Sequence, residues 1–187
     1  MTCIVSFKTE SGSVVIAGDY MASDGHHFTK VKSPKVFAKA ANCFVGYTSS
    51  FRMGQILQNC WSLPPKMEGQ DTESYVYLDI VESLRATFNS YGYGSKAGIE
   101  DIAGNFILIY EDRIFEIQSN YSVLEIDSDI VAIGSGRDAA LGALHSLLPI
   151  SGDDEDELEA LLSTVFSSVN KVTASVSADF MYLVAEE

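Results

Sequence analysis

The sequence has little positive charge, few cysteines and no long apolar run, and each shortage excludes a class of protein. Only 12 Lys and Arg stand against 26 Asp and Glu, so the net charge of -14 repels phosphate backbones and argues against a nucleic-acid partner. The three cysteines, Cys3, Cys43 and Cys60, form no C-x-x-C pair, which argues against a disulfide framework and a zinc site. No apolar run approaches the ~18 residues of a membrane span, and the N-terminus lacks the layout of a signal peptide. We therefore expect a cytoplasmic protein with reduced thiols and no membrane partner.

The chain nevertheless contains enough apolar sequence for one core. Its 187 residues are 47% apolar and 20% charged, which is ordinary for a globular protein. A domain of this size buries roughly 70% of its unfolded surface without help from disulfides or metals. Because no internal repeat, low-complexity segment or linker divides the chain, we predict a single domain over residues 1–187.

Short β-branched runs and four-residue apolar spacings alternate along the chain. The runs predict strands at 2–7, 14–17, 35–37, 42–46, 104–110, 113–118, 123–126, 129–133 and 178–185. The four-residue spacings predict helices at 50–61, 72–90, 138–148 and 153–171. Each sheet needs a buried face, so the expected fold is α+β, a four-layer αββα sandwich of two antiparallel sheets between helical layers.

The first candidate for chemistry is Thr2, which directly follows Met1. A small side chain at position 2 normally allows removal of the initiator methionine, and we expect Thr2 then to open a strand with a free α-amine. That amine can accept the proton of the Thr2 hydroxyl, so one residue supplies both a nucleophile and a base. Threonine is also common at position 2 for no catalytic reason, and Thr2 alone indicates little.

Asp19 and Lys35 give Thr2 its significance. Asp19 ends the string V-V-I-A-G-D, and Lys35 begins a predicted strand. Separately, an Asp after Gly is usually a turn former and a Lys is usually a surface charge. Together, a lysine beside an N-terminal amine disfavours protonation of that amine, and a carboxylate beside the lysine keeps it charged and in place. An amine that acts as a base at neutral pH requires these electrostatics.

This pattern resembles the proteasome β-subunits and, more closely, the bacterial HslV peptidase. Thr2, Asp19 and Lys35 match in order, with Lys35 sixteen residues beyond Asp19, although the first hairpin is one residue longer here. The strings C-F-V-G-Y at 43–47 and A-I-G-S-G at 132–136 extend the resemblance. The resemblance implies the N-terminal-nucleophile (Ntn) hydrolase fold and a threonine peptidase. In that family Thr2 would be the nucleophile, Lys35 would tune its amine, and Asp19 would orient Lys35.

The resemblance also implies supporting residues. The family serine in the Gly-Ser-Gly turn lies near the nucleophile and helps to hold the amine, which makes Ser135 a candidate. The family's oxyanion donor is a backbone N–H beside a glycine, and here Thr48 or Ser49 would have to provide it. The late acid of many proteasome subunits has no counterpart in residues 170–177, where Asn170, Thr173 or Ser177 could make neutral hydrogen bonds instead.

Other patterns compete with this interpretation. Residues 134–139 satisfy the G-x-G-x-x-G/A dinucleotide fingerprint, although the parallel strand of a Rossmann unit is not predicted after them. The acids at 153–157 resemble a calcium loop only in charge, and more simply occupy the first turn of a helix. His26, His27 and His145 lack partners at ligand spacing. We therefore expect no metal and no cofactor.

The expected function is a threonine endopeptidase that hydrolyses peptides or unfolded proteins inside a homo-oligomeric ring. By resemblance, an ATPase unfoldase would be a partner of that ring. Two alternatives stay open. One is a non-catalytic ring or scaffold protein that retains Met1, and the other is a small-amide hydrolase of the same fold.

Assembly can be tested directly. Light scattering at micromolar concentration should detect a species of many subunits, because apolar faces of helices such as 50–61 would pack on neighbouring copies. A clean monomer would contradict the ring peptidase and leave the free-standing amide hydrolase.

Overall fold

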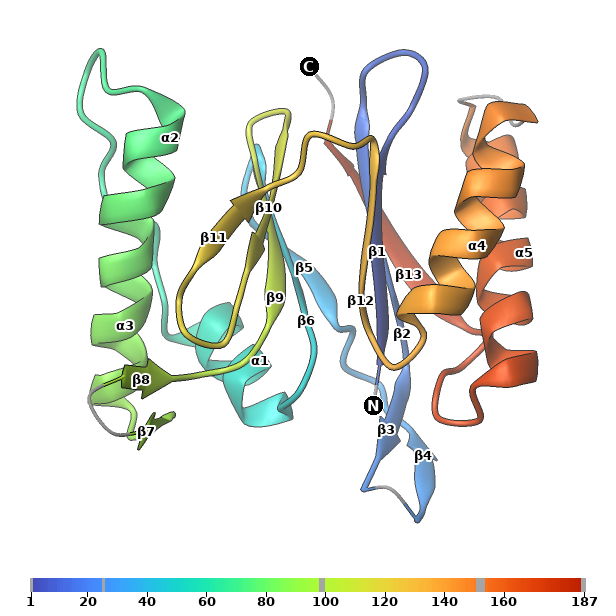
Figure 1. The fold of residues 1–187 in the computed structure, drawn as a ribbon, viewed down its shortest axis with the longest axis horizontal. Helices are drawn as coiled ribbons and strands as arrows, with labels where there is room; N and C mark the ends of the chain where they lie inside the picture. The colour runs from blue at the N-terminus through green and yellow to red at the C-terminus, as the bar shows by residue number, and fades with distance from the viewer. Residues whose placement is uncertain (1, 25, 98–99, 151–153, 186–187) are drawn as a thin grey trace.

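Two antiparallel sheets form the centre of the structure (Figure 1). The structure is a computed structural model, and it describes residues 2–24, 26–97, 100–150 and 154–185. The first sheet has the spatial order β12 (Ile130–Gly134), β1 (Cys3–Lys8), β2 (Val14–Asp19) and β13 (Phe180–Ala185). Its register places Gly134 opposite Cys3 and Phe180 opposite Asp19. The start of β1 and the ends of β2 and β12 therefore lie at the same end of the first sheet.

The second sheet faces the first. Its spatial order is β11 (Val123–Glu125), β10 (Arg113–Ile117), β9 (Phe106–Tyr110), β6 (Cys43–Tyr47) and β5 (Val36–Ala40). Side chains that alternate along the strands meet between the sheets, among them Ile4, Ile16, Val36 and Ile107. At Gly46 the sheets are so close that a Cβ would lie 2.6 Å from the Ile4 side chain.

Helices cover the outer faces of both sheets (Figure 1). On the second sheet these are α1 (Phe51–Asn59), α2 (Thr72–Ser74), the π-helical segment η1 (Tyr75–Ile80) and α3 (Val81–Ser90). On the first sheet they are α4 (Arg137–Leu147) and α5 (Glu155–Val172), with the 3-10 turn η2 (Leu148–Ile150) after α4. Cys3, Val5 and Phe7 of β1 face these helices, whereas Ile4 faces the other sheet. The period of two in β1 thus serves two separate cores.

The structure confirms the predicted mixture of helices and antiparallel sheets, and differs in detail. Residues 72–90 form a π-helical segment between two α-helical pieces. The sequence predicted one continuous helix there, because hydrogen bonds from residue i to residue i+5 leave no distinct mark on four-residue apolar spacing. Two hairpins lie outside the predicted strands and helices. They are β3 (Met21–Ser23) with β4 (Phe28–Lys30), and β7 (Ser95–Ala97) with β8 (Glu100–Ile102). Three-residue strands are too short for a reliable alternation pattern, so only pairing defines them.

The fold also decides between the competing patterns. Every strand pair in the described residues is antiparallel, including β12 with β1, which excludes the Rossmann interpretation of residues 134–139. At the acidic helix start, Asp154 caps α5 by accepting the Glu157 N–H at 2.9 Å. Asp153 lies outside the described residues. None of the described helices has both the length and the apolar character needed to cross a membrane.

Two glycine substitutions test how closely the end of β12 approaches Thr2. Gly134 has φ +95°, and a Cβ on it would lie 2.2 Å from the Thr2 carbonyl oxygen. Gly134→Ala should lower the free energy of unfolding by about 2 kcal/mol or more, since both the backbone conformation and the contact oppose it. Gly142→Ala, in α4 with open space around it, should raise that energy by about 0.5–1 kcal/mol. Urea unfolding measures both, and equal effects would contradict the close approach at Gly134.

Candidate active site

Thr2 lies buried at the end of the first sheet where β1 begins, and both its backbone nitrogen and its carbonyl oxygen are hydrogen-bonded. The Thr2 nitrogen donates to Ser135 Oγ at 3.3 Å, and the N–H of Gly136 donates to the Thr2 carbonyl oxygen at 3.3 Å. Ser135 Oγ also lies 3.3 Å from Ser175 Oγ. The turn after β12 therefore fixes the nitrogen and the carbonyl group of Thr2. The whole residue is 5% exposed.

Asp19 is fully buried at the end of β2, and four donors surround its carboxylate. Oδ1 accepts the N–H of Cys3 at 2.9 Å and Lys35 Nζ at 2.8 Å. Oδ2 accepts the N–H of Met21 at 2.8 Å and that of Ser177 at 3.3 Å. A buried carboxylate needs such donors because it has lost its hydration. One oxygen of Asp19 thereby connects the residue after Thr2 to the ammonium group.

Lys35 stands directly before β5 and is 1% exposed. Its ammonium binds Asp19 Oδ1 and also donates to the carbonyl oxygen of Met21, and it lies 6.0 Å from the centre of the Phe51 ring. Burial lowers the pKa of Lys35 from its usual value, and the neighbouring Asp19 carboxylate works in the opposite direction. Lys35 is thus a buried cation held in place from two sides.

Cys3 is not a rival nucleophile beside Thr2. Its side chain is fully buried in the core under α4 and α5. Burial, with a smaller effect of the Asp19 charge, raises the pKa of the Cys3 thiol to about 12. A thiol of this kind is almost entirely protonated at neutral pH and out of reach of a substrate.

Ser49 and Thr48 follow β6 but offer different backbone donors. The N–H of Thr48 already donates to the Asn105 carbonyl oxygen at 3.1 Å. No hydrogen bond within the described residues uses the N–H of Ser49. Ser49 has φ +70°, a conformation that favours glycine, and Gly104 makes room for it, since a Cβ there would lie 3.3 Å from Ser49 Cβ. Ser49 is therefore the better placed donor of the two.

The segment before β13 contributes groups to which the sequence assigned no definite role. Ser175 contacts Ser135 through its hydroxyl, and Ser177 acts through its backbone N–H on Asp19. Asn170 holds this loop by donating to the Val176 carbonyl oxygen at 2.6 Å. The sequence shows only that small polar residues precede the last strand. Their place beside Asp19 follows from the pairing of that strand, β13, with the end of β2.

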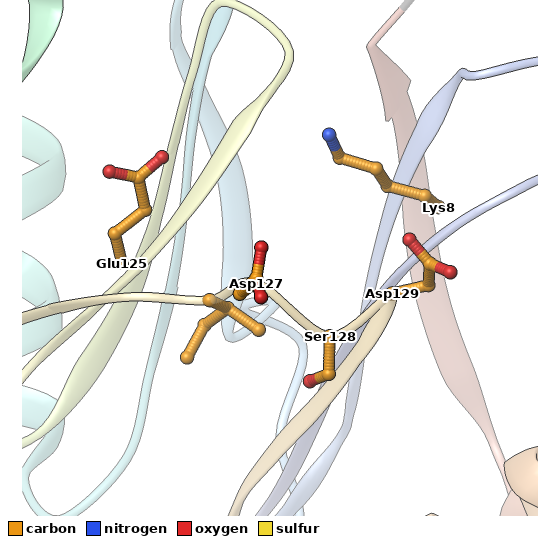
Figure 2. A pocket seen from close by; sticks show the side chains of 6 residues that line it. Lys8, Glu125, Asp127, Ser128 and Asp129 are labelled. Carbon is orange, nitrogen blue, oxygen red and sulfur yellow. The ribbon is translucent and has the colours of Figure 1, made fainter.

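A hollow lies at the opposite end of the sheets from Thr2. Figure 2 shows Lys8, Glu125, Asp127, Ser128 and Asp129 around it, contributed by the end of β1 and the connection from β11 to β12. Its charges are mixed, and it contains none of the residues around Thr2. The described residues include no group of three or more His, Cys, Asp or Glu side chains suited to a metal.

The fold that carries these residues is that of the proteasome-like Ntn hydrolases, as the sequence resemblance implied. BPH from Thiobacillus denitrificans, also solved in complex with epoxomicin, has a TM-score of 0.78 and 20% identity over 98% of this chain and 97% of that chain. HslV from Trypanosoma brucei has a TM-score of 0.68 and 18% identity over 99% of each chain. Anbu from Pseudomonas aeruginosa, solved as a helical assembly, has a TM-score of 0.66 and 13% identity over 97% of this chain and 80% of that chain. No protein-family model and no curated protein matches the sequence.

The buried ion pair makes a prediction about stability. Lys35→Met should lower the free energy of unfolding by about 3 kcal/mol, because it leaves the Asp19 carboxylate buried beside an apolar side chain. Lys39→Met is the matched control. Lys39 is half-buried and donates to the carbonyl oxygens of Leu57 and Gln58, so its loss should cost about 1 kcal/mol or less. Denaturant midpoints of the two variants give the comparison, and similar values would contradict a paired charge at Lys35.

Proposed function

We propose that the mature chain is a threonine peptidase whose nucleophile is Thr2, exposed as an N-terminal residue once Met1 is removed. The observation that supports this most directly is the shared oxygen of Asp19. It accepts the N–H of Cys3 and the ammonium of Lys35, so a buried positive charge lies two hydrogen bonds from the backbone next to Thr2. Such a charge opposes protonation of the Thr2 amine and keeps it available as a base.

In the first half of the reaction, Thr2 Oγ forms a bond to the carbonyl carbon of the peptide. The hydroxyl proton passes to the Thr2 amine, and negative charge develops on the carbonyl oxygen. The free N–H of Ser49 is the proposed donor to that oxygen. The carbon–nitrogen bond then breaks as the amine returns the proton to the leaving nitrogen. An ester on Thr2 and a new peptide N-terminus result.

In the second half, water clears the ester. The Thr2 amine takes a proton from the water, whose oxygen adds to the ester carbon, and Thr2 Oγ leaves with the proton restored. Ser135 has a positioning role in both halves, since its hydroxyl contacts the Thr2 nitrogen and the Thr2 carbonyl oxygen. The reaction needs no cofactor in this scheme.

The same proposal covers architecture and assembly. The order of helices, sheet, sheet and helices in Figure 1 supports the four-layer αββα sandwich, and the near-complete coverage of BPH and HslV supports one domain over residues 1–187. A helical assembly is described for an Anbu complex, which supports a homo-oligomer here. We include in the proposal a ring chamber for protein substrates and an ATPase that feeds it.

Covalent labelling tests the nucleophile. A β-lactone offered to protein lacking Met1 should add to Thr2, because only a free amine can take the hydroxyl proton. Mass spectrometry of the N-terminal peptide locates the adduct. Thr2→Ser should keep it, Thr2→Ala should lose it, and protein that retains Met1 should stay unlabelled.

Two further variants separate tuning from folding. Lys35→Met should react roughly 100-fold more slowly than wild type, whereas Lys39→Met should react normally. If mature wild-type protein stays unlabelled while Thr2→Ala hydrolyses peptides at the full rate, Thr2 is not the nucleophile. A protein with neither labelling nor hydrolysis would favour the non-catalytic scaffold.

A further inference from the structure

Positive charge is concentrated in one stretch of this acidic chain. Residues 25–67 contain none of the 26 Asp and Glu, yet they contain half of the 12 Lys and Arg. These basic residues are Lys30, Lys32, Lys35, Lys39, Arg52 and Lys66. The stretch includes β4, β5, β6 and α1, which surround the Lys35 edge of the second sheet. Three of these six cations are paired with carboxylates from other parts of the chain, namely Lys30 with Asp179, Lys35 with Asp19 and Lys66 with Glu111.

An open groove of about 750 Å³ lies within this stretch, between the segment before β5 and helix α1. Ser33 lines one side of it, and Tyr47 and Phe51 supply its aromatic part. The two rings pack edge to face, with their centres 6.2 Å apart. Exposed polar side chains of α1 complete it, namely Arg52, Gln55 and Asn59. No Asp or Glu lines the groove.

The groove adjoins the candidate catalytic residues. The Tyr47 N–H donates to the Lys35 carbonyl oxygen at 3.0 Å, and the Phe51 ring is 6.0 Å from Lys35 Nζ. Ser49, the proposed oxyanion donor, stands in the chain between these two aromatic residues. In Figure 1, α1 lies at the same end of the molecule as the N-terminus. A peptide whose carbonyl reaches Ser49 would therefore place its adjacent side chain near the groove.

Arg52 is the only charged side chain that lines the groove, and it has no carboxylate partner within the described residues. The ammonium of Lys35, by contrast, is already bound by Asp19 and Met21. A guanidinium presents five N–H donors in a fork that matches a carboxylate, and the amides of Gln55 and Gln58 add neutral donors. The groove is thus equipped for an anionic side chain.

We propose that this groove binds an acidic side chain of the substrate, that of the residue whose carbonyl Thr2 attacks, and that Arg52 determines this preference. The inference rests on the proposed peptidase function and specifies its substrate class. The net charge of -14 does not oppose it strongly, because charges beyond the Debye length of about 8 Å are largely screened at physiological salt.

Three fluorogenic peptides that differ only in this residue, Glu, Gln or Leu, test the proposal on assembled wild-type protein lacking Met1. We expect kcat/KM for the Glu peptide to exceed that for the Gln peptide roughly 10-fold or more, as a charge-assisted contact would give. Arg52→Gln should bring this ratio close to one, because the glutamine amide keeps a hydrogen-bond donor but carries no charge. Lys8→Gln, which removes the same charge at the opposite edge, should keep the wild-type ratio.

Several results would overturn the proposal. One is faster turnover of the Leu peptide than of the Glu peptide by wild-type protein, and another is an unchanged Glu to Gln ratio in Arg52→Gln. If Arg52→Gln instead changes the assembly size while the ratio stays the same, a second copy of the chain occupies the groove.

Failure of the proposed function gives a different pattern, with no turnover of any peptide and no β-lactone adduct. The groove can then be tested alone by fluorescence anisotropy with labelled Glu and Gln peptides. Tighter binding of the Glu peptide that is lost in Arg52→Gln supports an acid-binding groove, and equal affinities overturn it.

Discussion

The ion pair between Asp19 and Lys35 is the interaction on which the arrangement of the site depends. Asp19 ends a strand of the first sheet, and Lys35 precedes a strand of the second, so the pair joins the two sheets at the edge where Thr2 lies. Both side chains are almost completely buried, and burial of charge is unfavourable unless donors and acceptors surround it. The N–H groups of Cys3, Met21 and Ser177 and the Met21 carbonyl oxygen meet that need.

This dependence explains why several distant segments converge on one carboxylate. Apart from the Lys35 ammonium, the donors to Asp19 are backbone N–H groups from three different parts of the chain, which an ordinary change of side chain does not remove. The geometry around Thr2 is therefore robust to sequence change, provided that Asp19 and Lys35 remain. Such robustness accords with a fold shared with BPH and HslV at 20% identity or less.

Ser49 shows how local backbone geometry adapts where the chain departs from the family pattern. Ser49 keeps a left-handed conformation that glycine would adopt more easily, and Gly104 supplies the space for its Cβ. The Ser49 Cβ thus lies beside Gly104, and the Ser49 N–H stays without a hydrogen-bond partner among the described residues. In the Gly-Ser-Gly turn, which matches the family pattern, Gly134 leaves room for the Thr2 carbonyl oxygen.

The sequence by itself determined the main strands and helices, the order of Thr2, Asp19, Lys35 and Ser135, and the acid-free stretch. These follow from apolar periods and residue types within short segments, which neighbouring residues in the chain control. Only the tertiary structure decided that Asp19 binds the Ser177 N–H, 158 residues away, and that Ser135 contacts the Thr2 nitrogen across 133 residues. It also decided that the Thr48 N–H donates to the Asn105 carbonyl oxygen, whereas the Ser49 N–H donates to no group in the described residues, and that Arg52 lines a groove beside Lys35. Such contacts arise when two sheets pack face to face, and no local pattern encodes which backbone groups that packing leaves without a partner.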